Sequence, residues 1–201
     1  MESKKYLEDI TEIKDLMSRS SRFISLSGLS GILAGIYAIT GAIITYIFLL
    51  PTNDYVVLHS WNFRMIIGVL IAVAVLSFVT AYLLTTRKAK QNNEKIWDDT
   101  TKRLLINFLI PLVTGGIYIL IKLNSQHYGL TGSLMLIFYG LALVNASKYT
   151  IGNVRYLGYV EIVLGLICAA FPGYGFWFWI IGFGVLHIIY GSLIYFKEQK
   201  A

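Results

Sequence analysis

Charged residues are scarce in this chain of 201 residues. Only 14% of its residues are Asp, Glu, Lys or Arg, whereas 56% are hydrophobic. An ordinary soluble domain carries about 25% charged residues, so this chain lacks the polar surface that a water-exposed globule needs. The shortage excludes the soluble globular class and predicts an integral membrane protein, with the lipid bilayer as its first partner.

Cysteine and the sequence signatures of catalysis are also nearly missing. The one cysteine, Cys168, lies inside an apolar block, so neither an intramolecular disulfide nor a thiolate metal cluster can form. The sequence contains no nucleophile elbow, no His-Glu-x-x-His helix and no phosphate-binding loop. We therefore expect a protein that is not an enzyme and that holds no metal or other cofactor.

What the chain has in abundance is long apolar blocks. Backbone polar groups cannot stay unpaired in hydrocarbon, so blocks of about 20 residues are expected to be membrane-spanning helices. The blocks do not alternate in polarity as the strands of a transmembrane barrel do. We therefore expect an all-α membrane fold, a six-transmembrane-helix bundle over residues 23–196, followed by a cytoplasmic tail at 197–201. The predicted spans are residues 23–50, 65–86, 104–123, 129–147, 156–171 and 175–196.

The distribution of Lys and Arg predicts how these spans are oriented. With six spans, all but two of the 17 Lys and Arg residues fall on one side of the membrane, and only Arg64 and Lys122 fall on the other. Cytoplasmic loops carry an excess of basic residues, so we expect both termini in the cytoplasm and the protein in the inner (plasma) membrane. The basic residues are spread over several loops, which argues against a nucleic-acid partner.

Residues 1–22 are predicted to form a separate cytoplasmic amphipathic helix. Its apolar residues recur at helical spacing between charged ones, namely Tyr6, Ile10, Ile13 and Met17. The helix can rest on the inner leaflet, or residues 2–20 can dock a protein partner or a second copy of the chain. Because this segment is charged and the first apolar block is long, we expect that block to be an uncleaved signal-anchor.

Two ionisable residues lie well inside the predicted spans. Glu161 in the fifth span and His187 in the sixth are each 13 residues from Tyr174 in the connecting turn, so an antiparallel hairpin brings them to similar depth. Each shares its helix face with glycines, which predicts that both point into the bundle. We expect a Glu161–His187 pair with Tyr190 as a third member. The pair can lock the hairpin, or it can form a proton-responsive or substrate-binding site.

Small and amide side chains predict how the helices pack. Ser27, Gly31 and Gly35 lie four residues apart in the first span and would let another helix approach closely. Asn107 and Asn145 lie at similar depth in the third and fourth spans, and we expect them to form hydrogen bonds between helices.

A short repeated segment raises the question of internal symmetry. Residues 28–31 read Gly-Leu-Ser-Gly, and residues 129–132 read Gly-Leu-Thr-Gly. The first and fourth spans run in opposite directions in the predicted topology. An inverted repeat of three plus three spans, the plan of many transporters, therefore stays open.

The last predicted hairpin carries a family resemblance. Its first helix contains Gly158-Tyr-Val-Glu161 and Gly165, its turn is Phe171-Pro172-Gly173, and its second helix contains Gly184-Val-Leu-His187-Ile-Ile-Tyr190-Gly191. Over residues 157–192 this resembles the hairpin unit of the HdeD-like acid-resistance membrane proteins, which repeat such a hairpin three times over six spans. The resemblance implies a stress-linked inner-membrane protein of bacteria without a known catalytic centre.

Together these features predict a non-enzymatic multi-pass inner-membrane protein of stress response or regulation. It would act through a partner-binding cytoplasmic face that contains the N-terminal helix or the loop at residues 87–103. The alternative is a small-solute or proton-coupled transporter or channel that uses Glu161 and His187.

Overall fold

A computed structural model describes Tyr6, Ile10 and residues 27–49, 60–91, 97–150 and 154–199. Helices account for almost all of these residues, and the described part of the chain contains no β-strand. The prediction of an all-α fold is therefore confirmed for these segments. The predicted amphipathic helix at residues 1–22 lies outside the described residues, apart from Tyr6 and Ile10.

The apolar blocks form long helices joined by short connections. The elements are α2 (Gly28–Phe48), α3 (Trp61–Gln91), α4 (Asp99–Asn124), α5 (Thr131–Ala146), the 3-10 turn η1 (Ser147–Tyr149), α6 (Val154–Ala170), α7 (Gly175–Trp179), the π-helical segment η2 (Ile180–Leu186) and α8 (His187–Glu198). The last three elements form one continuous helix. By length and composition four helices can cross a membrane, namely α2, α3, α4 and the helix over Gly175–Lys197. The helices α5 and α6 are shorter, with 16 and 17 residues.

A tight turn joins α6 to the last helix. The backbone N–H of Tyr174 donates to the carbonyl oxygen of Phe171 at 3.3 Å, and Gly173 has a φ of 99°. Proline followed by a glycine in this conformation is typical of a type II turn, because only glycine enters the left-handed region without strain. The chain therefore reverses over Pro172 and Gly173, and α6 lies antiparallel to the helix that follows.

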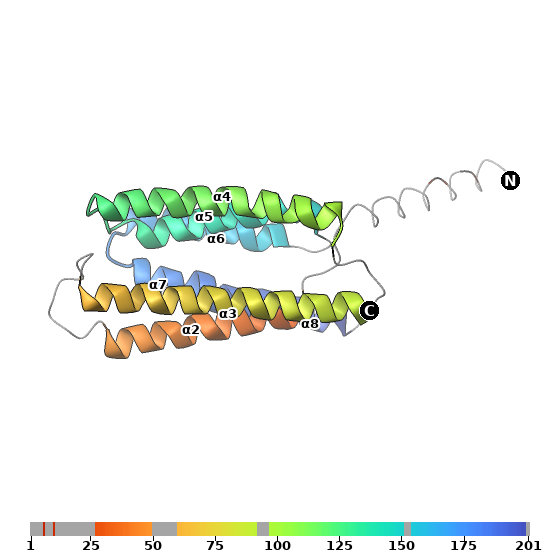
Figure 1. Cartoon of the computed structure of the whole chain (residues 1–201), viewed down its shortest axis with the longest axis horizontal. Coiled ribbons are helices and arrows are strands. Elements are labelled where there is room, and N and C mark those ends of the chain that lie inside the picture. Colours follow the sequence, from red (N-terminus) through yellow and green to blue (C-terminus); the bar gives the residue numbers. More distant parts are fainter. Residues whose placement is uncertain are drawn as a thin grey trace.

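The helices run side by side along the long axis of the molecule and form two groups (Figure 1). In the first, which we call the α5 group, α5 packs against α4 and α6. In the second, the α2 group, α2 packs against α3 and α8. The segment α7 contacts α5 and α6, while η2 contacts α6 and α2. The last helix therefore connects the two groups.

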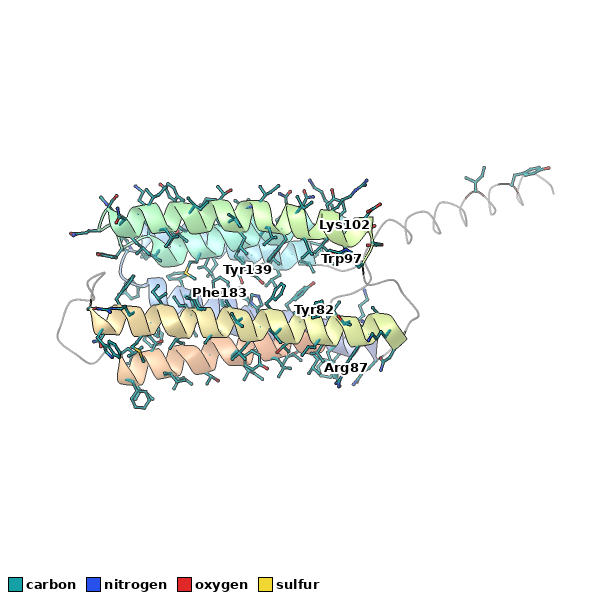
Figure 2. All side chains as sticks on the ribbon, viewed as in Figure 1. Tyr82, Arg87, Trp97, Lys102, Tyr139 and Phe183 are labelled. Carbon is teal, nitrogen blue, oxygen red and sulfur yellow. The ribbon has the colours of Figure 1, made fainter. Side chains whose placement is uncertain are left out.

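Basic residues gather at one end of the bundle. Figure 2 shows Arg87, near the end of α3, and Lys102, near the start of α4, at the same end. The last turn of α8 adds Lys197. Lys122 lies in the last turn of α4, at the opposite end of that helix. Arg87, Lys102 and Lys197 thus lie at one end of the bundle, and Lys122 lies at the other.

The outer surface of the bundle is apolar. In α3, none of the residues of an apolar stretch of 18 is buried within the protein. Within this helix, Val75 and Phe78 are 53% and 65% exposed. Water would solvate such a surface poorly, whereas lipid chains are as apolar as these side chains. The exposure of the long helices therefore supports placement of the protein in a membrane.

Candidate functional site between the two helix groups

Glu161 and His187 lie next to each other in the interior. Glu161 lies near the middle of α6 and is 0% exposed, and His187, the first residue of α8, is 7% exposed. The distance from His187 Nδ1 to Glu161 Oε1 is 3.6 Å. This separation allows an electrostatic contact between the two groups but exceeds the usual length of a hydrogen bond.

The hydrogen bonds of His187 go to other partners. Its Nδ1 lies 2.9 Å from the carbonyl oxygen of Gly182. Because a carbonyl oxygen only accepts, Nδ1 carries the hydrogen and donates it. In the neutral ring, Nε2 is then an acceptor, and it receives the hydroxyl hydrogen of Tyr139 at 2.8 Å. His187 therefore joins a residue of α5 to the backbone of η2.

The carboxyl group of Glu161 is enclosed without a hydrogen-bond partner among the described residues. It lies against the backbone of Gly182, where an added Cβ atom would be 2.6 Å from Glu161 Oε2 and would also collide with Leu136. Leu136 is 0% exposed as well. The absent side chain of Gly182 thus creates the space that the carboxyl group fills.

Aromatic rings surround the imidazole of His187. The rings of Phe183 and His187 are stacked with centroids 6.0 Å apart, and Tyr139 lies 5.0 Å from Phe183 and 5.4 Å from His187. Trp179 continues the row at 5.2 Å from Phe183. Figure 2 shows Tyr139 and Phe183 between the two helix groups. The polar contacts are therefore embedded in apolar surroundings, which strengthens electrostatic interactions.

The π-helical segment positions these groups. Its seven residues, Ile180–Leu186, precede His187 directly and include Gly182 and Gly184. In a π-helix the backbone bonds span five residues, and short π segments inside α-helices are frequent at functional sites. Here the carbonyl that receives the imidazole hydrogen belongs to the segment itself, five residues before His187.

Tyr139 takes the place that the sequence led us to expect for Tyr190. The hydroxyl of Tyr190 is buried and has no hydrogen-bond partner among the described residues, and its ring packs against the apolar cluster of Leu143, Val154 and Leu157. Tyr139 was missed because tyrosines in spans usually mark the membrane interface. Its position in the middle of α5, far from either helix end, was the available signal.

Two of the three predicted packing residues, Gly31 and Gly35, lie where α2 packs against the last helix. The third, Ser27, lies just before the start of α2. A Cβ atom on Gly31 would be 3.1 Å from Gly191 Cα, and one on Gly35 would be 2.6 Å from the carbonyl oxygen of Gly184. Ser27 precedes α2 as its N-cap residue. Gly28 continues the face instead and lies against Gly191 and Tyr195.

The two asparagines are placed differently from each other. The side-chain amide of Asn107 donates to the carbonyl oxygen of Arg103 in its own helix at 2.8 Å. Asn145 is partly buried near the end of α5. The amide of Asn107 is therefore used locally, one turn back along α4, rather than for the bond between helices that we expected.

The described residues contain no group of three or more His, Cys, Asp or Glu side chains that could hold a metal ion. Chemically, the site offers one carboxyl group, one imidazole and one phenol, all able to donate or accept a proton. Comparison with protein-family models, with curated proteins and with solved structures found no match to this chain.

Proposed function

We propose that the chain is a non-enzymatic, six-span membrane protein of regulation or stress response, with both termini on the cytoplasmic side of the inner (plasma) membrane. The short helices α5 and α6 would be the fourth and fifth spans, since 16 or 17 residues extend about 24–26 Å, close to the thickness of a bilayer core. The collection of basic residues at one end supports the orientation. The resemblance to HdeD-like hairpins supports a role in stress.

The observation that carries this proposal is the enclosed contact among Glu161, His187 and Tyr139. Ionisable groups are costly at membrane depth and are retained where they hold helices together or respond to protons. The site joins α5, α6 and the last helix, so a change of charge within it would bias how these helices pack. In this proposal the site controls a cytoplasmic face made of residues 2–20 or the loop at 87–103.

A site-specific photo-crosslinker tests the cytoplasmic face in native membranes. Trp97 is 66% exposed at the basic end, and a crosslinker there should form a defined adduct with a partner or a second copy. The E161Q variant should reduce the yield of that adduct several-fold. The matched control position is Gln126, exposed beyond the opposite end of α4. Equal adducts at both positions, or no adduct at Trp97, would contradict the proposal.

A second candidate function, conduction of protons by a transporter or channel, is favoured by one specific observation. The carboxyl group of Glu161 lacks a hydrogen-bond partner among the described residues, as expected of a group that exchanges a proton during a cycle. Purified protein in proteoliposomes should then dissipate an imposed pH gradient, followed with an internal pH dye. The E161Q variant should abolish the flux, and Tyr82→Phe, on the exposed face of α3, should not. An unchanged pH gradient with the wild-type protein would exclude this candidate.

A further inference from the structure

Two segments of the last hairpin have the same pattern of residues. Residues 158–165 in α6 read Gly-Tyr-Val-Glu-Ile-Val-Leu-Gly, and residues 184–191 across η2 and α8 read Gly-Val-Leu-His-Ile-Ile-Tyr-Gly. Glycine occupies the first and eighth positions of both segments, and isoleucine occupies the fifth. The fourth position is Glu161 in one segment and His187 in the other. Glu161 and His187 therefore occupy the same position of one repeated pattern.

The helices on which these segments pack also share a pattern. Along α5, four residues follow at spacings of four, three and four: a small residue, an isoleucine, a glycine and a branched aliphatic residue. The same residue types follow at the same spacings along α2. The residues are Ser133, Ile137, Gly140 and Val144 in α5, and Gly28, Ile32, Gly35 and Ile39 in α2. Each repeated segment thus has a partner helix of matching design.

The contacts within the two crossings agree at the central glycine. In the α5–α6 crossing, a Cβ atom on Gly140 would be 2.6 Å from the Gly158 carbonyl oxygen and 2.8 Å from Ile162. In the α2–α8 crossing, a Cβ atom on Gly35 would be 2.6 Å from the Gly184 carbonyl oxygen and 2.6 Å from Ile188. In both cases a glycine of the partner helix meets the first and fifth positions of the repeated segment.

The contacts also agree on either side of this point. The first glycine of each segment faces the last aliphatic residue of its partner helix. A Cβ atom on Gly158 would be 2.8 Å from Val144 Cγ2, and one on Gly184 would be 2.7 Å from Ile39 Cγ1. The eighth-position glycines, Gly165 and Gly191, meet the matched residues Ile137 and Ile32 in turn. The α5–α6 and α2–α8 crossings therefore have the same register.

We propose that the bundle contains two copies of one antiparallel helix crossing, and that the contact between Glu161 and His187 is where the copies meet and are held together. Because α6 and α8 are antiparallel, an approximate two-fold rotation about an axis perpendicular to the helices would exchange the crossings and, with them, the acid and the imidazole. The first and fourth spans then correspond, but in a register four residues away from the match of residues 28–31 with 129–132, and α6 corresponds to α8.

The contact between the copies is asymmetric in this conformation. His187 bonds to Gly182 in its own helix and to Tyr139 of the α5 group, whereas Glu161 lies over Gly182. The π-helical segment lies where the last helix passes from the α5 group to α2. The two crossings are therefore separate packing units that can turn relative to each other at the start of η2, before Gly184, once the contact opens.

Exchange of the two equivalent residues tests the repeat in the full-length protein in detergent. The single variants E161H and H187E place two like groups together, and each should lower the melting temperature by about 4 °C or more. The exchange E161H/H187E should recover at least half of the larger loss. The control exchange E161Y/Y190E moves the same carboxyl group to the seventh position of the other segment. It should recover none of the loss in melting temperature. An E161H/H187E protein that melts no higher than its worse single variant would overturn the proposal.

Glycine variants keep the proposal falsifiable if the single variants do not fold. Gly165→Ala and Gly191→Ala change matched positions of the two crossings, and each should lower the melting temperature by at least about 2 °C because the new methyl group meets the partner helix. Gly116→Ala, which meets nothing within 4 Å, should cause no loss. If either matched variant melts like the wild type, the crossings are not equivalent and the proposal fails.

Distances between spin labels test whether the contact holds the copies together. Labels at Tyr156 in α6 and Leu193 in α8, both exposed, report on the separation of the groups. Labels at Tyr156 and Leu141 report within the α5 group. E161Q should broaden or shift the first distance distribution and leave the second unchanged. If E161Q leaves both distributions as in the unmodified protein, the contact does not hold the copies together.

Discussion

Removal of one hydroxyl group measures the contribution of the candidate site to stability. The variant Tyr139→Phe keeps the ring, and with it the contacts to Phe183 and His187, but removes the hydrogen donated to His187 Nε2 at 2.8 Å. A hydrogen bond contributes about 0.5–1.5 kcal/mol net, and those between membrane helices average about 0.6 and reach about 1.7 kcal/mol. Because His187 is only 7% exposed, the unpaired nitrogen adds roughly 1 kcal/mol.

These terms predict a loss of about 1.5–2.7 kcal/mol in the free energy of unfolding for Tyr139→Phe. For a protein of this size, that corresponds to a melting temperature lowered by about 3–11 °C in detergent. The control is Tyr82→Phe, since Tyr82 is 57% exposed and its hydroxyl is expected to contribute little. Intrinsic fluorescence or light scattering during heating provides the measurement.

A double-mutant cycle separates this hydrogen bond from general damage. Once His187→Leu has removed the acceptor, Tyr139→Phe should cost at least about 1 kcal/mol less than it does in the wild-type background. Effects that add within about 0.3–0.5 kcal/mol would mean that the two residues do not interact energetically. That result would refute the hydrogen-bond assignment and the view that His187 joins the two helix groups.

Three further predictions concern the space beside Glu161, a helix cap and the topology. Gly182→Ala should lower stability by about 1–3 kcal/mol because its methyl group meets the enclosed carboxyl group. Gly116→Ala, the control, should be neutral or stabilising by up to about 1 kcal/mol. A change in stability of the same sign for both variants in melting experiments would be inconsistent with this packing. Asp98→Ala removes an acceptor 2.7 Å from a backbone N–H in the first turn of α4 and should cost about 1 kcal/mol in chemical unfolding, while a melting curve like that of the wild type would argue against the cap. Single cysteines at Lys102 and Gln126 should react with impermeant thiol reagents from opposite sides of the membrane, and labelling of both from one side would rule out the topology.

The sequence was sufficient to place Glu161 and His187 near each other. A tight turn at Pro172 and Gly173 and two antiparallel helices make residues at equal distance from the turn meet, and these are local features of the chain. The structure adds what depends on side-chain geometry. The imidazole donates to the Gly182 carbonyl five residues back, rather than to the carboxyl group 3.6 Å away.

The rest of the site was not predictable from sequence because it depends on contacts between distant segments. Tyr139 reaches His187 only because α5 lies beside the last helix, and no periodicity within α5 reveals that neighbour. The π-helical segment could not be predicted either, because helix propensity scales do not separate residues that favour a π-helix from those that favour an α-helix. Helical periodicity also could not separate Ser27 from Gly28 on the packing face, since 3.6 residues per turn allows spacings of both three and four.

The close packing of the Glu161 carboxyl group against Gly182 has an evolutionary consequence. Two atoms cannot occupy one volume, so a chain that acquires a side chain at position 182 must shorten or lose the group at position 161 in the same lineage. Among relatives of this protein, the two positions are expected to vary together, with bulk at one matched by its absence at the other.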